Sequence, residues 1–330
     1  MWIEYSIFLL ETATVVVAIL LVCFGFILLR ALARAQKQQN GVLTIDAMHV
    51  SYQKRYFKLI CETSEKKTRK GLIKEYKKHH KKLEKEAKRR LFVIDFKGDI
   101  QANAASSLRE EVTAILQIAS PKDHVLMRLE SGGGVVHGYG LATSQLERLK
   151  LCGIPITISV DKVAASGGYM MAAIADTIIA APFAIVGSIG VLAQIPNFNR
   201  WLKNKGVDFE QVSAGEYKRT LTVFGKNTET GRKKLSNELE ETHALFKDLI
   251  KQYRPEIDLS VVATGEHWFG KQALKLKLID KLQTSDDFIL NLINGGEYKV
   301  YRIEYKVKQN VASKMKILAS NALSSLVIKQ

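Results

Sequence analysis

The chain has 330 residues, of which 47% are hydrophobic, and this composition argues against global disorder and for one large domain or two modest ones. The formal net charge of +16 is concentrated in residues 66–90, which hold thirteen Lys or Arg side chains against three carboxylates. The high charge therefore describes that segment rather than the rest of the chain. Three widely spaced cysteines, without Cys-x-x-Cys or Cys/His spacing, argue against a disulfide framework and a zinc site.

An apolar run covers residues 6–29 and is interrupted by a single acid, Glu11. It is long enough to cross a bilayer as a helix. A cleaved signal peptide would begin with basic residues, and none precedes this run, so we predict a transmembrane anchor within residues 1–30. Basic residues follow the run, which by the positive-inside rule favours a cytoplasmic location for the large C-terminal part of the chain, but three charges do not fix the side.

Residues 31–90 predict a charged, mainly helical connector with too few apolar residues to pack. Its basic part is typical of a solvated helix or a flexible linker. A second interpretation is a segment that lies on anionic lipid headgroups, which suits a chain anchored nearby. Nucleic-acid binding is not expected, because no aromatic stacking pattern accompanies the charges.

The pattern changes at Leu91, where short apolar runs begin to alternate with segments of helical spacing. Strands are predicted at 91–96, 124–130, 155–160 and 176–182, and helices between them at 103–120 and 135–149. This alternation indicates an α/β domain with a mostly parallel sheet. Further helices are predicted at 197–205, 228–253 and within 264–280, and an amphipathic one at 313–329.

A serine follows the third predicted strand at a turn of small residues. Ser166 stands between two alanines and two glycines, and a helical run comes next. Small neighbours let a substrate backbone approach, and the N-terminus of a helix offers free N–H groups to a developing negative charge. The turn lies at the carboxyl end of a strand, where open α/β sheets place their sites. Ser166 is therefore a candidate nucleophile, although Ser-Gly-Gly turns are also common as simple connections between a strand and a helix.

A serine hydroxyl needs a base. Of seven histidines, only His137 lies near a glycine turn, and no G-x-S-x-G elbow is present. Lysine is the other choice, provided that desolvation lowers its pKa. Lys218, beside Tyr217 and the segment Leu-Thr-Val-Phe, is a candidate outside the basic segment. By itself it remains one of many basic residues.

Four segments together resemble the signal peptide peptidase A family of serine–lysine membrane proteases, in particular its SohB branch. They are the glycine-rich loop at 131–146, the nucleophile segment at 161–176, the segment VGSIGVL at 186–192, which resembles a strand of the family, and the base segment at 213–224. The resemblance implies a ClpP/crotonase-like spiral of β-β-α units, here as a peptidase domain at 91–295, preceded by one transmembrane helix. Residues 296–330 would then be a C-terminal extension that serves as an assembly or surface helix.

The resemblance also implies roles for single residues. Ser166 would be the nucleophile and Lys218 the general base, with Ser188 orienting the lysine. The backbone N–H groups of Gly133 and Gly167 would form the oxyanion hole. Where the family often has Ser-Pro-Gly-Gly, this chain has Ser131 followed by three glycines, which leaves the donor glycine open by one residue. No metal or cofactor would be needed.

The expected protein is a membrane-anchored serine endopeptidase of the bacterial inner membrane that cleaves signal-peptide remnants or other membrane-derived or misfolded peptides. Relatives assemble into rings in which a neighbouring copy supplies the lysine in at least some members, so a homo-oligomer is expected. Membrane lipid is an expected partner and nucleic acid is not. Two alternatives stay open: a crotonase-like acyl-CoA enzyme, and a non-catalytic membrane scaffold.

Overall fold

The computed structural model describes residues 41–86, 89–215 and 217–307, together with residues 12, 14–17, 19 and 24. The chain divides into two units, Thr44–Glu304 and the two ends of the chain, and the first of these holds the candidate site. Among the described residues, no helix combines the length and apolar character needed to cross a membrane. Most of the predicted anchor at 6–29, and all of the predicted helix at 313–329, lie outside the described residues.

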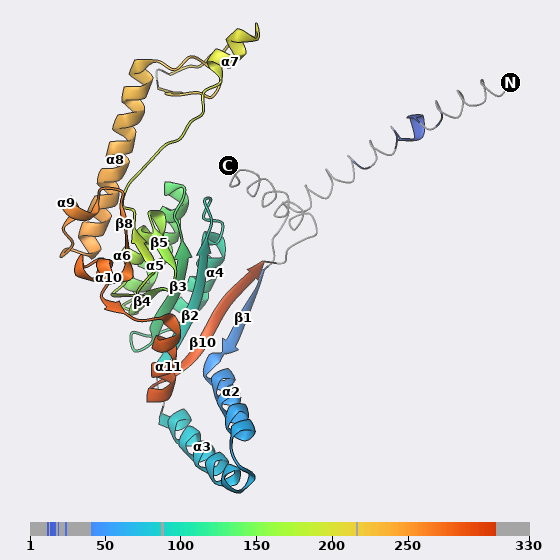
Figure 1. The fold of residues 1–330 in the computed structure, drawn as a ribbon, viewed down its shortest axis with the longest axis vertical. Coiled ribbons are helices and arrows are strands. Elements are labelled where there is room, and N and C mark those ends of the chain that lie inside the picture. Colours follow the sequence, from blue (N-terminus) through green and yellow to red (C-terminus); the bar gives the residue numbers. More distant parts are fainter. Residues whose placement is uncertain are drawn as a thin grey trace, which may run out of the picture. The chain divides into compact units, whose positions relative to one another are not determined.

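A ten-stranded sheet organises the described part of the chain (Figure 1). Its main path runs in the order β1 (Gly41–Ala47), β10 (Tyr298–Val307), β2 (Arg89–Gly98), β3 (His124–Ser131), β4 (Ile156–Val160), β6 (Thr177–Ala180) and β9 (Lys281–Leu282). From β10 to β9 the neighbouring strands pair in parallel. The mixed α/β class, the mostly parallel sheet and the four predicted strands are confirmed.

The sheet branches at the carboxyl end of β3. There the short strand β5 (Val163–Ala165) pairs with β3 and also with β7 (Ile185–Gly187), which runs antiparallel to β8 (His267–Phe269). Strands of three residues are too short to show an alternating pattern. Of these three, only β7 was anticipated, because it overlaps the segment at 186–192 that resembles a strand of the family. The branch brings the ends of three chain segments together, and the candidate site forms there.

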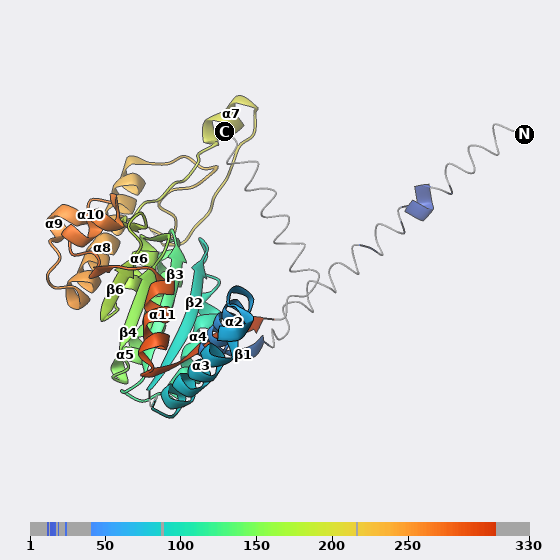
Figure 2. The ribbon, with the colours of Figure 1, turned by 60° about the horizontal axis from the view of Figure 1, so that its bottom comes forward.

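Helices cover the sheet and bury its apolar runs on both faces, which explains why the strands read as continuous apolar segments. The helices of the body are α4 (Ala105–Leu116), α5 (Val136–Leu151), α6 (Gly167–Ala173), α8 (Glu229–Tyr253), α9 (Leu259–Val262), α10 (Gly270–Lys275) and α11 (Ser285–Gly295). Helix α5 packs against α4 and α6, and α8 packs against α6 (Figure 2). Helix α6, which begins directly after Ser166, is therefore buried along its whole length.

The basic connector is part of the folded structure. It contains β1 and two helices, α2 (Met48–Thr63) and α3 (Lys66–Glu86), so the mainly helical prediction missed one strand. Met48 is buried in a core cluster with residues of β2 and α11. The ring of His49 forms a 2.9 Å hydrogen bond with the carbonyl of Val300. A few buried contacts thus hold a segment whose composition predicted no packing.

Residues 191–228, which we call the arm, extend beyond the end of the sheet and carry α7 (Asn199–Asn204) at the tip (Figures 1 and 2). The long helix α8 then leads back to the body. The arm exposes many large apolar side chains: Leu192, Ile195, Phe198, Trp201, Val207, Phe209, Val212, Tyr217 and Phe224. A surface of this kind is typical of a contact with another protein.

Candidate active site

Ser166 occupies a strained position between β5 and α6. Its φ of 51° is rare for a residue with a side chain, and such strain persists only where surrounding contacts fix the backbone. Here the Ser166 N–H donates to the Gly187 carbonyl at 2.8 Å, and the Ser166 carbonyl accepts from the Met170 N–H at 2.9 Å. The turn leaves the hydroxyl at the head of a helix, with the residue half-buried.

Glycines allow two backbone segments to meet at this turn. Gly133 has a φ of 89°, and a Cβ there would lie 2.7 Å from the Ser166 Cβ and 2.8 Å from the Gly167 nitrogen. A Cβ on Gly168 would lie 2.6 Å from the Ser131 carbonyl oxygen, and one on Gly167 would collide with the ring of Tyr139. These positions accept no side chain, because the glycine-rich loop and the start of α6 are in direct backbone contact.

A chain of hydrogen bonds connects the glycine-rich loop to α5 and to the end of β2. The Tyr139 hydroxyl donates to the Asp99 carbonyl at 2.8 Å and lies 2.5 Å from the Ser131 hydroxyl. Ser131 Oγ accepts the Gly133 N–H at 3.1 Å. Burial raises the pKa of Tyr139 against the opposing hydrogen bond from Ser131, so the phenol keeps its proton as a donor. The Gly133 N–H is thus oriented but already has an acceptor.

Gly167 is better placed to donate. As the first residue of α6 it has no intrahelical acceptor, and its N–H has no acceptor among the described residues. Ser188 lines the same cleft as Ser166 and Gly167. It follows β7, has a φ of 51°, and donates its N–H to the Glu266 carbonyl at 2.6 Å. Ser188 directly follows Gly187, the residue that accepts the Ser166 N–H.

A cleft of about 820 Å³ collects four of the five predicted site residues: Ser166, Ser188, Gly133 and Gly167. Much of the rest of its wall is apolar, with Ile100, Val135, Met170, Leu192, Phe246 and Ala263. Among the described residues that line this cleft there is no lysine and no carboxylate. One chain therefore brings together the predicted nucleophile and the predicted backbone donors without the predicted base.

Lys218 lies elsewhere, in the arm. It is exposed, and its N–H closes a turn with the Gly215 carbonyl at 3.2 Å. It lines a separate cleft of about 740 Å³ with other residues of the arm, including Phe209, Val212 and Phe224. The described residues that line this cleft include none that line the Ser166 cleft.

Histidine was considered from the sequence only at His137, which is exposed on α5. The structure instead places His243, on α8, in the wall of the Ser166 cleft. Its Nε2 atom is buried and has no hydrogen-bond partner in the described part of the chain. A catalytic imidazole is normally oriented by a carboxylate, and none of the lining residues supplies one. No signal in the sequence connects His243 with Ser166, because α8 reaches the cleft only through tertiary packing.

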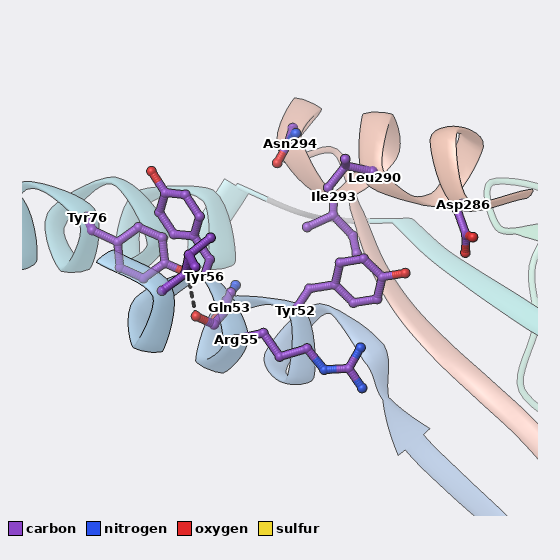
Figure 3. A pocket seen from close by; sticks show the side chains of 10 residues that line it. Tyr52, Gln53, Arg55, Tyr56, Tyr76, Asp286, Leu290, Ile293 and Asn294 are labelled. Atoms are coloured by element: carbon purple, nitrogen blue, oxygen red, sulfur yellow. Dashed lines mark hydrogen bonds between the residues drawn. The ribbon is translucent and has the colours of Figure 1, made fainter. Parts of the chain in front are cut away.

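A third cleft, of about 920 Å³, lies between α2, α3 and α11 (Figure 3). It is lined by Tyr52, Tyr56, Tyr76, Leu59, Leu290 and Ile293, with Gln53, Arg55, Asp286 and Asn294. The described residues that line it include no serine, cysteine or histidine, so it is not a candidate active site. Among the described residues, no group of three His, Cys, Asp or Glu side chains is arranged to hold a metal ion.

Comparison with known proteins supplies the family. The model of the peptidase family S49 N-terminal region matches residues 1–146, and the model of peptidase family S49 matches residues 148–298. The chain belongs to peptidase family S49. The S49 match includes Ser166, Ser188 and Lys218, and the N-terminal match includes Gly133.

The S49 relatives are similar over most of their length. The protein named "Probable protease SohB" of Haemophilus influenzae is 46% identical, over 94% of this chain and 90% of its own. Proteins of the same name from Buchnera aphidicola are 54% identical over 75% of this chain and 73% of their own (subsp. Acyrthosiphon pisum), and 43% over 99% and 96% (subsp. Schizaphis graminum). The predicted resemblance is confirmed, and these relatives support a peptidase rather than an acyl-CoA enzyme.

Proposed function

We propose that this S49 peptidase is a membrane-anchored serine endopeptidase that uses Ser166 and Lys218. The observation that carries the proposal is the strained Ser166 turn, held against the backbone of Gly133 and Gly167 at the head of a cleft. A strained backbone conformation at a half-buried residue among glycines costs folding free energy. A simple change of chain direction would not require a strained serine, whereas the presentation of a nucleophile would account for it.

In the proposed mechanism the neutral Lys218 amine takes the Ser166 hydroxyl proton as Oγ attacks the peptide carbonyl. The Gly167 N–H donates to the oxyanion that forms. The Gly133 N–H joins it by exchanging Ser131 Oγ for the oxyanion, which is the better acceptor because it is charged. The Lys218 ammonium then protonates the leaving amine. The amine of Lys218 then takes a proton from a water molecule as the water attacks the acyl carbonyl. The ester bond to Ser166 breaks, the lysine returns the proton to Ser166 Oγ, and the acyl group leaves as a carboxylic acid.

The base must come from another copy of the chain, or from a rearranged arm. An exposed lysine is protonated at neutral pH, and only desolvation or a neighbouring cation makes it a useful base. The exposed apolar side chains of the arm suit burial against a second copy. We propose that assembly into a ring of the ClpP/crotonase-like spiral fold carries Lys218 of one copy into the Ser166 cleft of the next. Ser188 Oγ then orients the amine.

The substrates proposed are signal-peptide remnants and other membrane-derived or misfolded peptides. The apolar cleft wall, without lysine or carboxylate among its described residues, suits apolar peptide side chains. The apolar run at 6–29 is the proposed single-pass anchor in the bacterial inner membrane.

Mixing two inactive variants tests both the dyad and the shared site. Ser166→Ala and Lys218→Ala, each purified as the full chain in detergent, should not hydrolyse a fluorogenic peptide. After subunit exchange, a mixture of the two should regain part of the wild-type activity. A fluorophosphonate probe should label Ser166 in the wild type. Full activity of Lys218→Ala would rule out the dyad, and failure of exchanged mixtures to recover would place the lysine in the same copy.

A further inference from the structure

Helix α3 presents one face built of lysines. Seven lysines are exposed there: Lys66, Lys67, Lys70, Lys74, Lys77, Lys78 and Lys81. At 3.6 residues per turn, all seven positions fall within an arc of about 120°. From residue 66 to residue 81 no carboxylate occupies that arc, because Glu75 points to another side of the helix. We call these seven side chains the lysine face.

The other side of α3 packs against α2 and fixes the lysine face in place. Tyr76 contacts Tyr56 with ring centroids 4.9 Å apart, and its hydroxyl donates to the Gln53 carbonyl at 3.2 Å (Figure 3). Helix α2 is in turn attached to the sheet through the buried Met48 and His49. The lysine face is therefore a surface of the folded structure.

The charges of the lysine face are not neutralised within the described part of the chain. None of the seven lysines pairs there with a carboxylate, and Lys77 alone has another partner, the ring of Phe57 at 6.0 Å. Lysines on one helix face repel each other when they are three or four positions apart. A dense layer of anions would relieve this repulsion, and a sparse one would not.

We propose that the lysine face binds the anionic headgroups of a membrane. Lysine brings a compact charge without the planar fork of arginine, and it suits many mobile phosphates better than one fixed phosphate. A surface for single-stranded nucleic acid would add open aromatic rings for stacking, whereas Tyr56 and Tyr76 pack on each other. The proposed anchor at 6–29 would keep the face at a high effective concentration near lipid. The inference relies on that anchor and is independent of the serine–lysine chemistry.

Lysine labelling tests the proposal on the full chain. The protein is reconstituted into vesicles of phosphatidylcholine alone or with phosphatidylglycerol, and a brief pulse of an acetylating reagent is read out residue by residue by mass spectrometry. With phosphatidylglycerol, the seven lysines should react roughly three- to five-fold more slowly. High salt should restore their rates because it screens the charges. The exposed Lys122, Lys233 and Lys275 should react equally in both vesicles.

A charge-reversal pair provides the control. Lys70→Glu/Lys74→Glu/Lys78→Glu should remove the lipid-dependent protection of Lys66, Lys77 and Lys81. The control variant Lys122→Glu/Lys233→Glu/Lys275→Glu makes the same charge change elsewhere, and the lipid-dependent protection of the lysine face should persist in it. Circular dichroism should confirm that both variants fold. Equal protection in both vesicles would overturn the proposal in favour of a protein contact. Protection by duplex DNA but not by anionic lipid would overturn it in favour of nucleic acid.

The anchor and the lysine face fail in different ways. Loss of flotation with neutral vesicles would contradict the anchor alone. Flotation with anionic vesicles only, abolished by the triple substitution on α3, would still support the lysine face.

Discussion

Ser166 and Lys218 have opposite surroundings in the same chain. Ser166 lies at the junction of β5, β7 and α6, where backbone hydrogen bonds and close contacts with glycines hold its backbone. Lys218 lies in a turn of the arm and is exposed, among apolar side chains that are also exposed. The first half of the proposed site is complete within the fold, and the second half depends on a surface that the chain does not itself cover.

The two halves of the proposed site therefore carry different free-energy costs, backbone strain at Ser166 and desolvation at Lys218. Strain at Ser166 is offset inside one chain by the core around α6. Desolvation of Lys218 requires another surface, so the base would become active only on assembly. Under the proposed mechanism, such a division would keep an isolated copy inactive.

Removal of the proposed base should have the largest effect. Lys218→Ala should lower kcat/KM roughly 10²- to 10⁴-fold, because general acid–base catalysis is lost. Lys226→Ala, at another exposed lysine of the arm, is the matched control and should leave hydrolysis nearly unchanged. His243→Ala should retain the greater part of kcat. Inactivity of His243→Ala together with an active Lys218→Ala would assign the base to the histidine in the cleft.

The nucleophile half can be tested at one glycine. Gly133→Ala should lower kcat roughly 10²- to 10³-fold, because the new methyl group meets Ser166 and the Gly167 nitrogen and displaces oxyanion donors. Gly132→Ala is the control, since a Cβ there has no neighbour within 4 Å. Both variants should keep the assembly size in light scattering. Equal rates for the two would remove Gly133 from the site.

The arm should matter through assembly. Val212 is 97% exposed beside Lys218, and Val212→Asp should weaken association and lower activity about tenfold at limiting protein concentration, as expected for a contact residue. Leu151→Asp, at an 87% exposed residue at the end of α5, is the matched control. Sedimentation velocity gives the assembly size. An unchanged size and rate for Val212→Asp would disconnect the arm from the interface.

The smallest effect concerns stability of the sheet rather than the site. Burial works against ionisation of Asp123, but hydrogen bonds from Arg90 and Ser120 outweigh it and lower the pKa of Asp123 from 3.8 to about 2. The carboxylate therefore stabilises the fold fully above about pH 4, and this contribution is lost as the pH falls towards 2. Asp123→Asn should lower the free energy of unfolding by about 2 kcal/mol at pH 7. It should also make that free energy depend less on pH between pH 4 and pH 2. Denaturant unfolding measured from pH 7 to pH 2 checks both.

The sequence was sufficient for elements whose signal is local. The continuous apolar runs at 91–96 and 124–130 are strands buried on both faces, and they were predicted within a few residues. The small residues around Ser166 also carried their own signal, because a sharp turn restricts side chains wherever it occurs. The strand in the basic connector was missed, since β1 is stabilised by its partner strand rather than by its composition.

The sequence by itself determined the α/β class, the position of the nucleophile turn and, through four ordered motifs, the family. Only the tertiary structure decided which of those residues meet. It joined Gly133 to Ser166, brought His243 into the cleft and left Lys218 outside it, because contacts between distant segments depend on packing and strand pairing that no local pattern encodes. It also gathered seven lysines of α3 on one face by fixing the opposite side of that helix against α2.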